Sequence, residues 1–276
     1  MPAPADSAVL TVERDGPVAT LWLDRPAKRN AMGAAFWDDF PRAVRALDAD
    51  PEVRAVVVAG RGGAFSAGLD LVEMGPALLA GDGADSDAGR SDAVYTLARR
   101  LQDAIGALAE AATPSVAAVW GACVGGGLDL AAACDVRVAA RDAVFGLREI
   151  RVGIVADLGA LQRLPALVGL GPTTEMALTG RDVAADEALR LGLVTSLHDG
   201  AEATLAAARA TAAAVAAHSP LVVRGVKAVL RASTDLPLAQ ALDHVALWNA
   251  AFLRSHDLTE AVTAHLEGRA PTYTGR

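Results

Sequence analysis

A glycine cluster between an expected strand and an expected helix constrains this chain more than any other feature. Gly125, Gly126 and Gly127 separate an apolar run at Ser115 to Val119 from another at Leu128 to Ala133. Glycine permits unusual backbone angles and lets a ligand approach the main chain closely. A helix that begins there directs unpaired N–H groups and the positive end of its dipole at that ligand. The pattern predicts either a plain tight turn or a site for an oxygen that becomes negatively charged during a reaction.

Three acids lie among small or apolar neighbours in and after this cluster: Asp129, Glu149 and Asp157. A second turn of small residues, Phe65 to Asp70, precedes it. Backbone donors combined with carboxylates suit proton transfer next to a carbonyl group, because the donors hold the enolate oxygen while the acids move protons. Burial raises a carboxyl pKa toward neutrality, as reversible proton transfer requires. The alternative for each acid is a helix cap or an ion pair, for example Asp157 with Arg163.

Composition and motifs exclude several classes of function. The chain has 276 residues, 53% of them hydrophobic, and a net charge of -8, which argues against general affinity for nucleic acid. It contains no dinucleotide fingerprint, no phosphate-binding P-loop, no metal-type cysteine spacing and no apolar run of membrane-spanning length. We therefore expect no metal, no separate cofactor, no nucleic-acid partner and no membrane partner. Because neither end shows a targeting pattern, a cytoplasmic location is expected.

Strand and helix patterns alternate through about the first two hundred residues. Strands are expected at Val18 to Leu23, Ala55 to Ala59 and Ser115 to Val119, and a helix at Met32 to Leu47 with Asn30 as its cap. Beyond Gly200 only helices are expected, which predicts an α/β core at residues 1–199 and a helical region at residues 200–276. Residues 75–90 are rich in Gly, Ala and Asp and are interpreted as a mobile surface loop. That loop and the helical region are expected to line part of a ligand pocket.

Two segments connect the chain to a known family. AFSAGLDLVEM at residues 64–74 and GACVGGGLDLAAACDVRVAA at residues 121–140 stand in the order and separation of the two oxyanion-hole motifs of the crotonase (enoyl-CoA hydratase/isomerase) superfamily. The chain resembles that superfamily over nearly its whole length. The resemblance implies an α/β crotonase (ClpP-like) fold of repeated ββα units with a helical C-terminal region. It also implies a homotrimer or homohexamer (a dimer of trimers).

The resemblance assigns roles to both turns. It implies that the amides of Ala67 and Gly126 bind the thioester oxygen of an acyl-CoA, and that Lys28 and Arg29 lie beside the nucleotide part of coenzyme A. Coenzyme A is then part of the substrate. The substrate-binding residues implied are Ala67, Gly68, Leu69, Asp70, Leu71 and Gly126.

The acids indicate a branch of the superfamily. Asp129, Glu149 and Asp157 are similar to the aspartate, glutamate and aspartate of the Δ3,5-Δ2,4-dienoyl-CoA isomerases of fatty acid β-oxidation. Hydratases carry a glutamate at the position of Asp129 and usually a small residue at that of Asp157. The resemblance implies that Glu149 and Asp157 move protons at C2 and C6 while Asp129 orients Glu149. Two alternatives are an enoyl-CoA hydratase that uses Asp129 and Glu149, and a non-catalytic RNA-binding or scaffolding member of the fold.

Overall fold

The computed structural model describes residues 7–80, 86–234 and 236–276, and its centre is a six-stranded sheet. The strand order is β1-β2-β3-β4-β6-β9, with β1 antiparallel to β2 and every later neighbour parallel. Strands β2, β3 and β4 are buried along their whole length, as expected for parallel strands covered on both faces. The strands are β1 (Leu10–Asp15), β2 (Val18–Leu23), β3 (Ala55–Gly60), β4 (Ser115–Val119), β6 (Val136–Ala140) and β9 (Ser196–His198).

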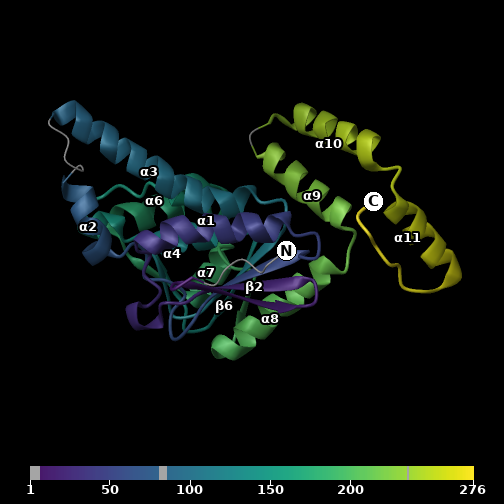
Figure 1. Cartoon of the computed structure of the whole chain (residues 1–276), viewed down its shortest axis with the longest axis horizontal. Coiled ribbons are helices and arrows are strands. Elements are labelled where there is room, and N and C mark those ends of the chain that lie inside the picture. The colour runs from purple at the N-terminus through teal and green to yellow at the C-terminus, as the bar shows by residue number, and fades with distance from the viewer. Residues whose placement is uncertain (1–6, 81–85, 235) are drawn as a thin grey trace.

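Helices cover both faces of this sheet. In Figure 1, α1 (Ala34–Ala49) and α3 (Asp87–Glu110) lie on one side and α8 (Gly200–Ala216) lies on the other. Helix α8 buries Ala208, Ala212 and Ala216 against the sheet, so the helical region beyond residue 200 contributes to the core. The predicted division at residue 200 stays a prediction. The remaining core helices are α4 (Gly126–Ala133), α5 (Ala160–Val168), α6 (Leu170–Thr179) and α7 (Ala185–Leu191).

A second, three-stranded sheet supports the turns that carry the site. Its order is β5-β7-β8, with β5 (Ala122–Val124) parallel to β7 (Val144–Gly146) and β8 (Asp182–Ala184) antiparallel to β7. An isolated bridge between Ser66 and Cys123 extends it to the first small-residue turn. The two turns, far apart in sequence, are therefore held side by side.

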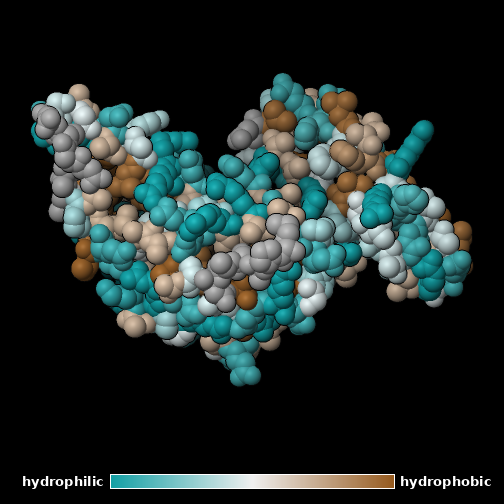
Figure 2. Space-filling view, viewed as in Figure 1, coloured by the Kyte–Doolittle hydropathy of each residue, from teal (hydrophilic) through white to brown (hydrophobic). Residues whose placement is uncertain are grey.

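The last three helices project away from the core (Figure 1). They are α9 (Pro220–Ser233), α10 (Leu238–Phe252) and α11 (His256–Glu267), as expected from the sequence. An ion pair of 2.7 Å between Lys227 and Asp135 ties α9 to the core. No residue of α10 is buried, and Figure 2 shows hydrophobic residues gathered over α9 and α10.

Two local predictions are corrected. Residues 75–90 are largely helical, since α2 spans Leu71–Ala80 and α3 begins at Asp87, whereas residues 81–85 lie outside the described residues. Asn30 does not cap α1. Its side chain donates to the carbonyl oxygens of Arg61 and Ala64, and the first amide of the helix, that of Ala34, instead donates to Glu73 over 2.8 Å.

Among the described residues, no single helix is long and apolar enough to cross a membrane. Helices α8 and α9 reach that length and composition only when they are taken together across a bend of 107°.

Candidate active site

A cavity of about 400 Å³ lies where the two small-residue turns meet. Its wall combines both turns, helices α2 and α3, and the 3-10 helix η2 (Glu149–Val152) with the segment that follows it. Most of the predicted site residues are therefore brought together. Those that line the cavity are Arg29, Ala67, Leu69, Leu71, Gly126, Glu149 and Asp157.

The first turn is joined to the loop before α1 by two backbone hydrogen bonds. The amide of Met32 donates to Gly68 O over 2.8 Å, and the amide of Asp70 donates to Met32 O over 3.0 Å. Ala67 and Leu69 line the cavity, whereas Gly68 is buried against the second turn and Asp70 is buried beside Arg25 and Lys28. Neither Gly68 nor Asp70 lines the cavity, which corrects the expectation that these two residues belong to its wall.

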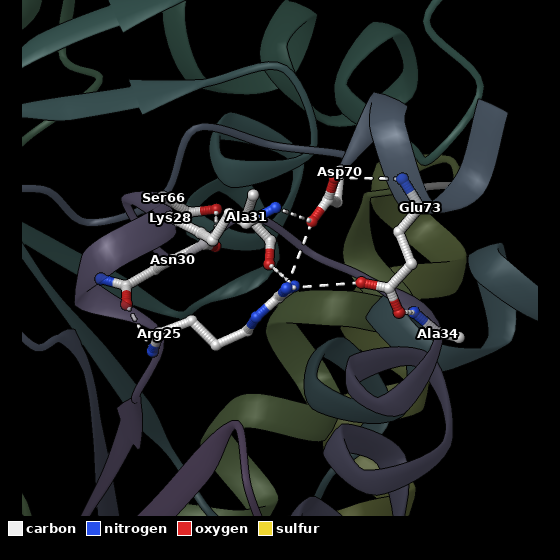
Figure 3. Close-up of polar contacts among 8 residues, drawn as sticks. All are labelled: Arg25, Lys28, Asn30, Ala31, Ala34, Ser66, Asp70 and Glu73. Atoms are coloured by element: carbon white, nitrogen blue, oxygen red, sulfur yellow. Dashed lines mark hydrogen bonds and ion pairs between the residues drawn. The ribbon is translucent and has the colours of Figure 1, made fainter.

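Asp70 instead anchors the first turn to the loop before α1 (Figure 3). Its carboxylate contacts the Arg25 guanidinium at 3.2 Å and the Lys28 ammonium at 3.8 Å, and it accepts from the Glu73 amide at 3.2 Å. Burial alone would raise the pKa of Asp70, but the Glu73 amide and the two cations hold it below its usual value. This residue is thus a structural counter-charge beneath the site.

The amide groups of the two turns divide into engaged and free donors. The Ala67 N–H donates to Arg29 O over 2.9 Å, so it is not available to a ligand, and the prediction that it forms the oxyanion hole is corrected. Leu69 N–H points away from Met32, and neither it nor Gly126 N–H has an acceptor among the residues that the structure describes. Both residues line the cavity. Leu69 and Gly126 therefore form the pair of free donors at this place.

Close approach of the two turns depends on Gly68. Its φ is +83°, and a Cβ atom there would lie 2.7 Å from Val124 O and 3.0 Å from Gly126 N. Glycine adopts this backbone conformation without steric cost. Any side chain at residue 68 would push the turns apart.

Glu149 is the first residue of η2 and is partly buried. Its Oε1 lies above the second turn, 3.3 Å from the position of a Cβ on Gly125, and its Oε2 is buried with no hydrogen-bond partner in the described structure. Burial, reinforced by the nearby charge of Asp157, raises the pKa of Glu149. Salt bridges from Arg148 (2.8 Å) and Arg151 (3.2 Å) to Asp182 fix η2 on both sides.

Asp157 lines the cavity from the segment before α5 and remains open to solvent. Desolvation by its surroundings raises the pKa of Asp157. The alternative of an ion pair with Arg163 is not found, because Arg163 donates to Leu158 O at 3.2 Å. Asp157 is thus a carboxyl group in the cavity wall that forms no ion pair with any residue the structure describes.

Asp129 differs from the other two acids because it is completely enclosed. Its Oδ1 accepts from the Ala160 N–H over 2.5 Å at the start of α5, and its Oδ2 is buried without a partner in the described residues. Burial, followed by the charge of Glu149, raises the pKa of Asp129 to about 7. It does not line the cavity, so it acts on a ligand only through Glu149 or through the α5 segment.

Several lining residues were missed from the sequence. They come from α3, at the helical spacing that places side chains on one face, which is the signal that would have found them. None of the described residues beyond 200 lines the cavity, which corrects the expectation that the helical region does so. The apolar residues concerned are Val94, Leu97, Ala98 and Leu101, whereas Leu78 of α2 falls within residues 75–90, which were expected to line the pocket.

No group of three or more His, Cys, Asp or Glu side chains that could hold a metal occurs within the described part of the chain. The independence of metal and cofactor stays a prediction.

Comparison with known proteins gives a consistent picture. The family described as Enoyl-CoA hydratase/isomerase matches residues 13–276. The peroxisomal Δ3,5-Δ2,4-dienoyl-CoA isomerase of Arabidopsis thaliana is 38% identical over 266 residues, 96% of this chain and 95% of that protein. The mitochondrial isomerase of Homo sapiens is 40% identical over 248 residues, 90% of this chain and 75% of that protein. The crystal structure of an enoyl-CoA hydratase from Bacillus anthracis superposes with a TM-score of 0.88 at 27% identity, covering 97% of this chain and 100% of that one.

The relatives contradict the expected cytoplasmic location. Their names place them in peroxisomes or mitochondria. The expectation rested only on the absence of a targeting pattern, and an absent signal does not identify a compartment.

Proposed function

The chain belongs to the enoyl-CoA hydratase/isomerase (crotonase) family, and from that premise we propose that it is a Δ3,5-Δ2,4-dienoyl-CoA isomerase. The observation that carries the proposal is that two of the three acids line the cavity and the third does not. Glu149 and Asp157 both line the cavity, whereas Asp129 is enclosed behind it. Two acids reach the ligand space from different elements, with two free amides in the same wall.

The reaction moves two conjugated double bonds by one position. It needs removal of a proton from C2 and addition of a proton at C6, and a single carboxyl group does not reach both carbons. We assign these transfers to Glu149 and Asp157. The ionised acid takes the C2 proton and becomes neutral, while the neutral acid gives its proton to C6 and becomes ionised, so the formula of the substrate is unchanged.

The negative charge of the dienolate falls on the thioester oxygen. We assign its binding to the amides of Leu69 and Gly126, because each is a free donor in the cavity wall. Donors held in place before the reaction stabilise developing charge without reorganisation. Burial raises the pKa of Glu149 and that of Asp157, which is the direction that proton transfer by carboxyl groups requires.

Hydration of a 2-enoyl-CoA is the second candidate, supported by the similarity to the Bacillus anthracis hydratase. That reaction would use Asp129 and Glu149 to handle one water molecule. The enclosure of Asp129 disfavours it, because the Asp129 carboxyl group does not line the space where such a water would bind.

One assay separates the two candidates. We expect the purified protein to convert 3,5-octadienoyl-CoA into the conjugated 2,4-dienoyl product, followed by its ultraviolet absorbance. Asp157→Asn keeps the side-chain shape but cannot accept a proton, so the isomerisation rate should fall by about 10²–10⁴-fold. Glu149→Gln should reduce both isomerisation and any hydration of 2-butenoyl-CoA. A protein that hydrates 2-butenoyl-CoA, does not isomerise the diene and is unaffected by Asp157→Asn would be a hydratase.

A further inference from the structure

The main chain of Asp157 is held by a residue that is distant in sequence. Gln102 of α3 donates its Nε2–H to Asp157 O over 2.8 Å, across a separation of 55 residues. No side chain within the described structure bonds to the Asp157 carboxylate, and Gln102 contacts only the main-chain carbonyl. The position of this acid is therefore set through its backbone.

The hydrogen bonds near Asp157 differ in which part of the backbone they hold. Ala160 N–H is held by Asp129 Oδ1, and Leu158 O is held by Arg163, so both neighbouring bonds lie on the C-terminal side of Asp157. On the N-terminal side, Ala156 is buried and the Ile154 N–H donates to Glu149 O over 3.1 Å, whereas the side chains of Ile154 and Val155 are exposed. Gln102 consequently supplies the only described side-chain bond to the Asp157 peptide unit itself.

The orientation of the Gln102 amide is also determined. Its Oε1 accepts from the Arg99 guanidinium over 2.9 Å, so its NH₂ group faces Asp157 O. The neighbouring residues Ala98 and Leu101 on the same helix line the cavity. One helix therefore contacts the ligand space and holds one of the two acids.

We propose that Gln102 is a positioning residue that holds Asp157 at the reacting end of the diene through the Asp157 carbonyl. This inference rests on the proposed isomerase function. Isomerisation needs Asp157 at one carbon, and small misplacement of a reacting group lowers a rate strongly. Hydration by Asp129 and Glu149 does not use Asp157, so loss of the Gln102 bond affects isomerisation selectively.

The test uses the full-length protein and Gln102→Leu, which keeps the bulk of the side chain without its donor. We expect kcat for 3,5-octadienoyl-CoA to fall by about tenfold, with KM changed by less than about twofold. In an Asp157→Asn background the same change should cost no further activity, because both substitutions act on one group. Arg100→Gln is the matched control. It removes a 2.6 Å contact between α3 and Asp38 without touching Asp157, and its kcat should equal that of the wild type.

Hydrogen exchange of the backbone tests, independently of activity, whether Gln102 holds Asp157 in place. Amides of residues 155–161 should exchange faster in Gln102→Leu than in the wild type, and Arg100→Gln should leave them unchanged. Unchanged exchange in Gln102→Leu would overturn the proposal, as would a loss of rate that adds to that of Asp157→Asn. A wild-type protein that does not isomerise the diene would refute the proposed function, whereas the exchange measurement would still decide whether Gln102 holds Asp157.

Discussion

The carboxyl group of Asp129 shows how one enclosed residue links stability to chemistry. Its Oδ1 satisfies the first amide of α5, which has no acceptor within its own helix. Its Oδ2 has no partner in the described structure, so a proton on that oxygen avoids a buried charge next to Glu149. The neutral acid is accordingly the favoured form in the folded protein below about pH 7.

This preference predicts a pH-dependent stability. The pKa of Asp129 is about 7 in the folded protein, against 3.8 in an unfolded chain, so its contribution is fully present below about pH 4 and is lost as the pH rises through 7. Asp129→Asn mimics the neutral acid and should unfold at a higher urea concentration than the wild type at pH 8. The difference should be on the order of a few kcal/mol, and it should vanish near pH 4.

Asp70 provides a control, because its contribution to stability should change with pH in the opposite direction. Its pKa is lowered, so its contribution is present at neutral pH and is lost as the pH falls below its unfolded value. Asp70→Asn should therefore be less stable than the wild type at pH 8. Equal behaviour of both asparagine variants at pH 8 would contradict these assignments.

At the scale of elements, the two turns contact each other closely, and an added side chain would have different effects at Gly126 and at Gly68. A Cβ on Gly126 would lie 3.3 Å from Met32 Sδ and 3.5 Å from Leu158 Cδ1, which small shifts of flexible side chains can accommodate. On Gly68 it would lie 2.7 Å from a backbone oxygen, at a φ that disfavours other residues. Two similar substitutions should thus have different consequences.

We expect Gly126→Ala to fold and to lose activity, because the added methyl group intrudes beside a free amide. Removal of one oxyanion donor costs about 10²–10³-fold in kcat in a comparable case. Gly68→Ala should instead lower the melting temperature, since strained backbone alone costs about 1–3 kcal/mol. Thermal unfolding and rates measured on both variants test this contrast. A fully active Gly126→Ala would argue against the oxyanion assignment.

At the scale of the whole molecule, the projecting helices expose many apolar side chains. Leu238, Leu242 and Leu247 of α10 are 76%, 58% and 63% exposed, and helices α9–α11 together line an apolar cavity of about 420 Å³. Contiguous apolar surface of this kind is typical of an interface. We propose that copies of this chain cover it and form a homotrimer or a homohexamer.

Light scattering coupled to size exclusion tests this proposal. The wild type should have three or six times the chain mass of 28.1 kDa. Leu247→Asp should shift the mass toward the monomer, because a buried unpaired charge is costly at an interface. Leu178→Asp, at a 69% exposed position on α6, is the matched control and should keep the wild-type mass. A monomeric wild type at micromolar concentration would refute the interface.

The sequence by itself determined the architecture and part of the site. The apolar runs at 18–23, 55–59 and 115–119 predicted β2, β3 and β4, because parallel strands buried on both faces are continuously hydrophobic. The motif spacing also brought Glu149, Asp157 and Gly126 to one cavity. Such features are local patterns, so they can be read along the chain.

Only the tertiary structure decided how each group points and what surrounds it. The direction of an amide depends on its acceptor across the fold, so Ala67 is engaged by Arg29 and Leu69 is left free. Enclosure depends on packing from several elements, and it separates Asp129 from the two acids that face the cavity. The bond from Gln102 joins segments 55 residues apart, and no local pattern encodes such a contact.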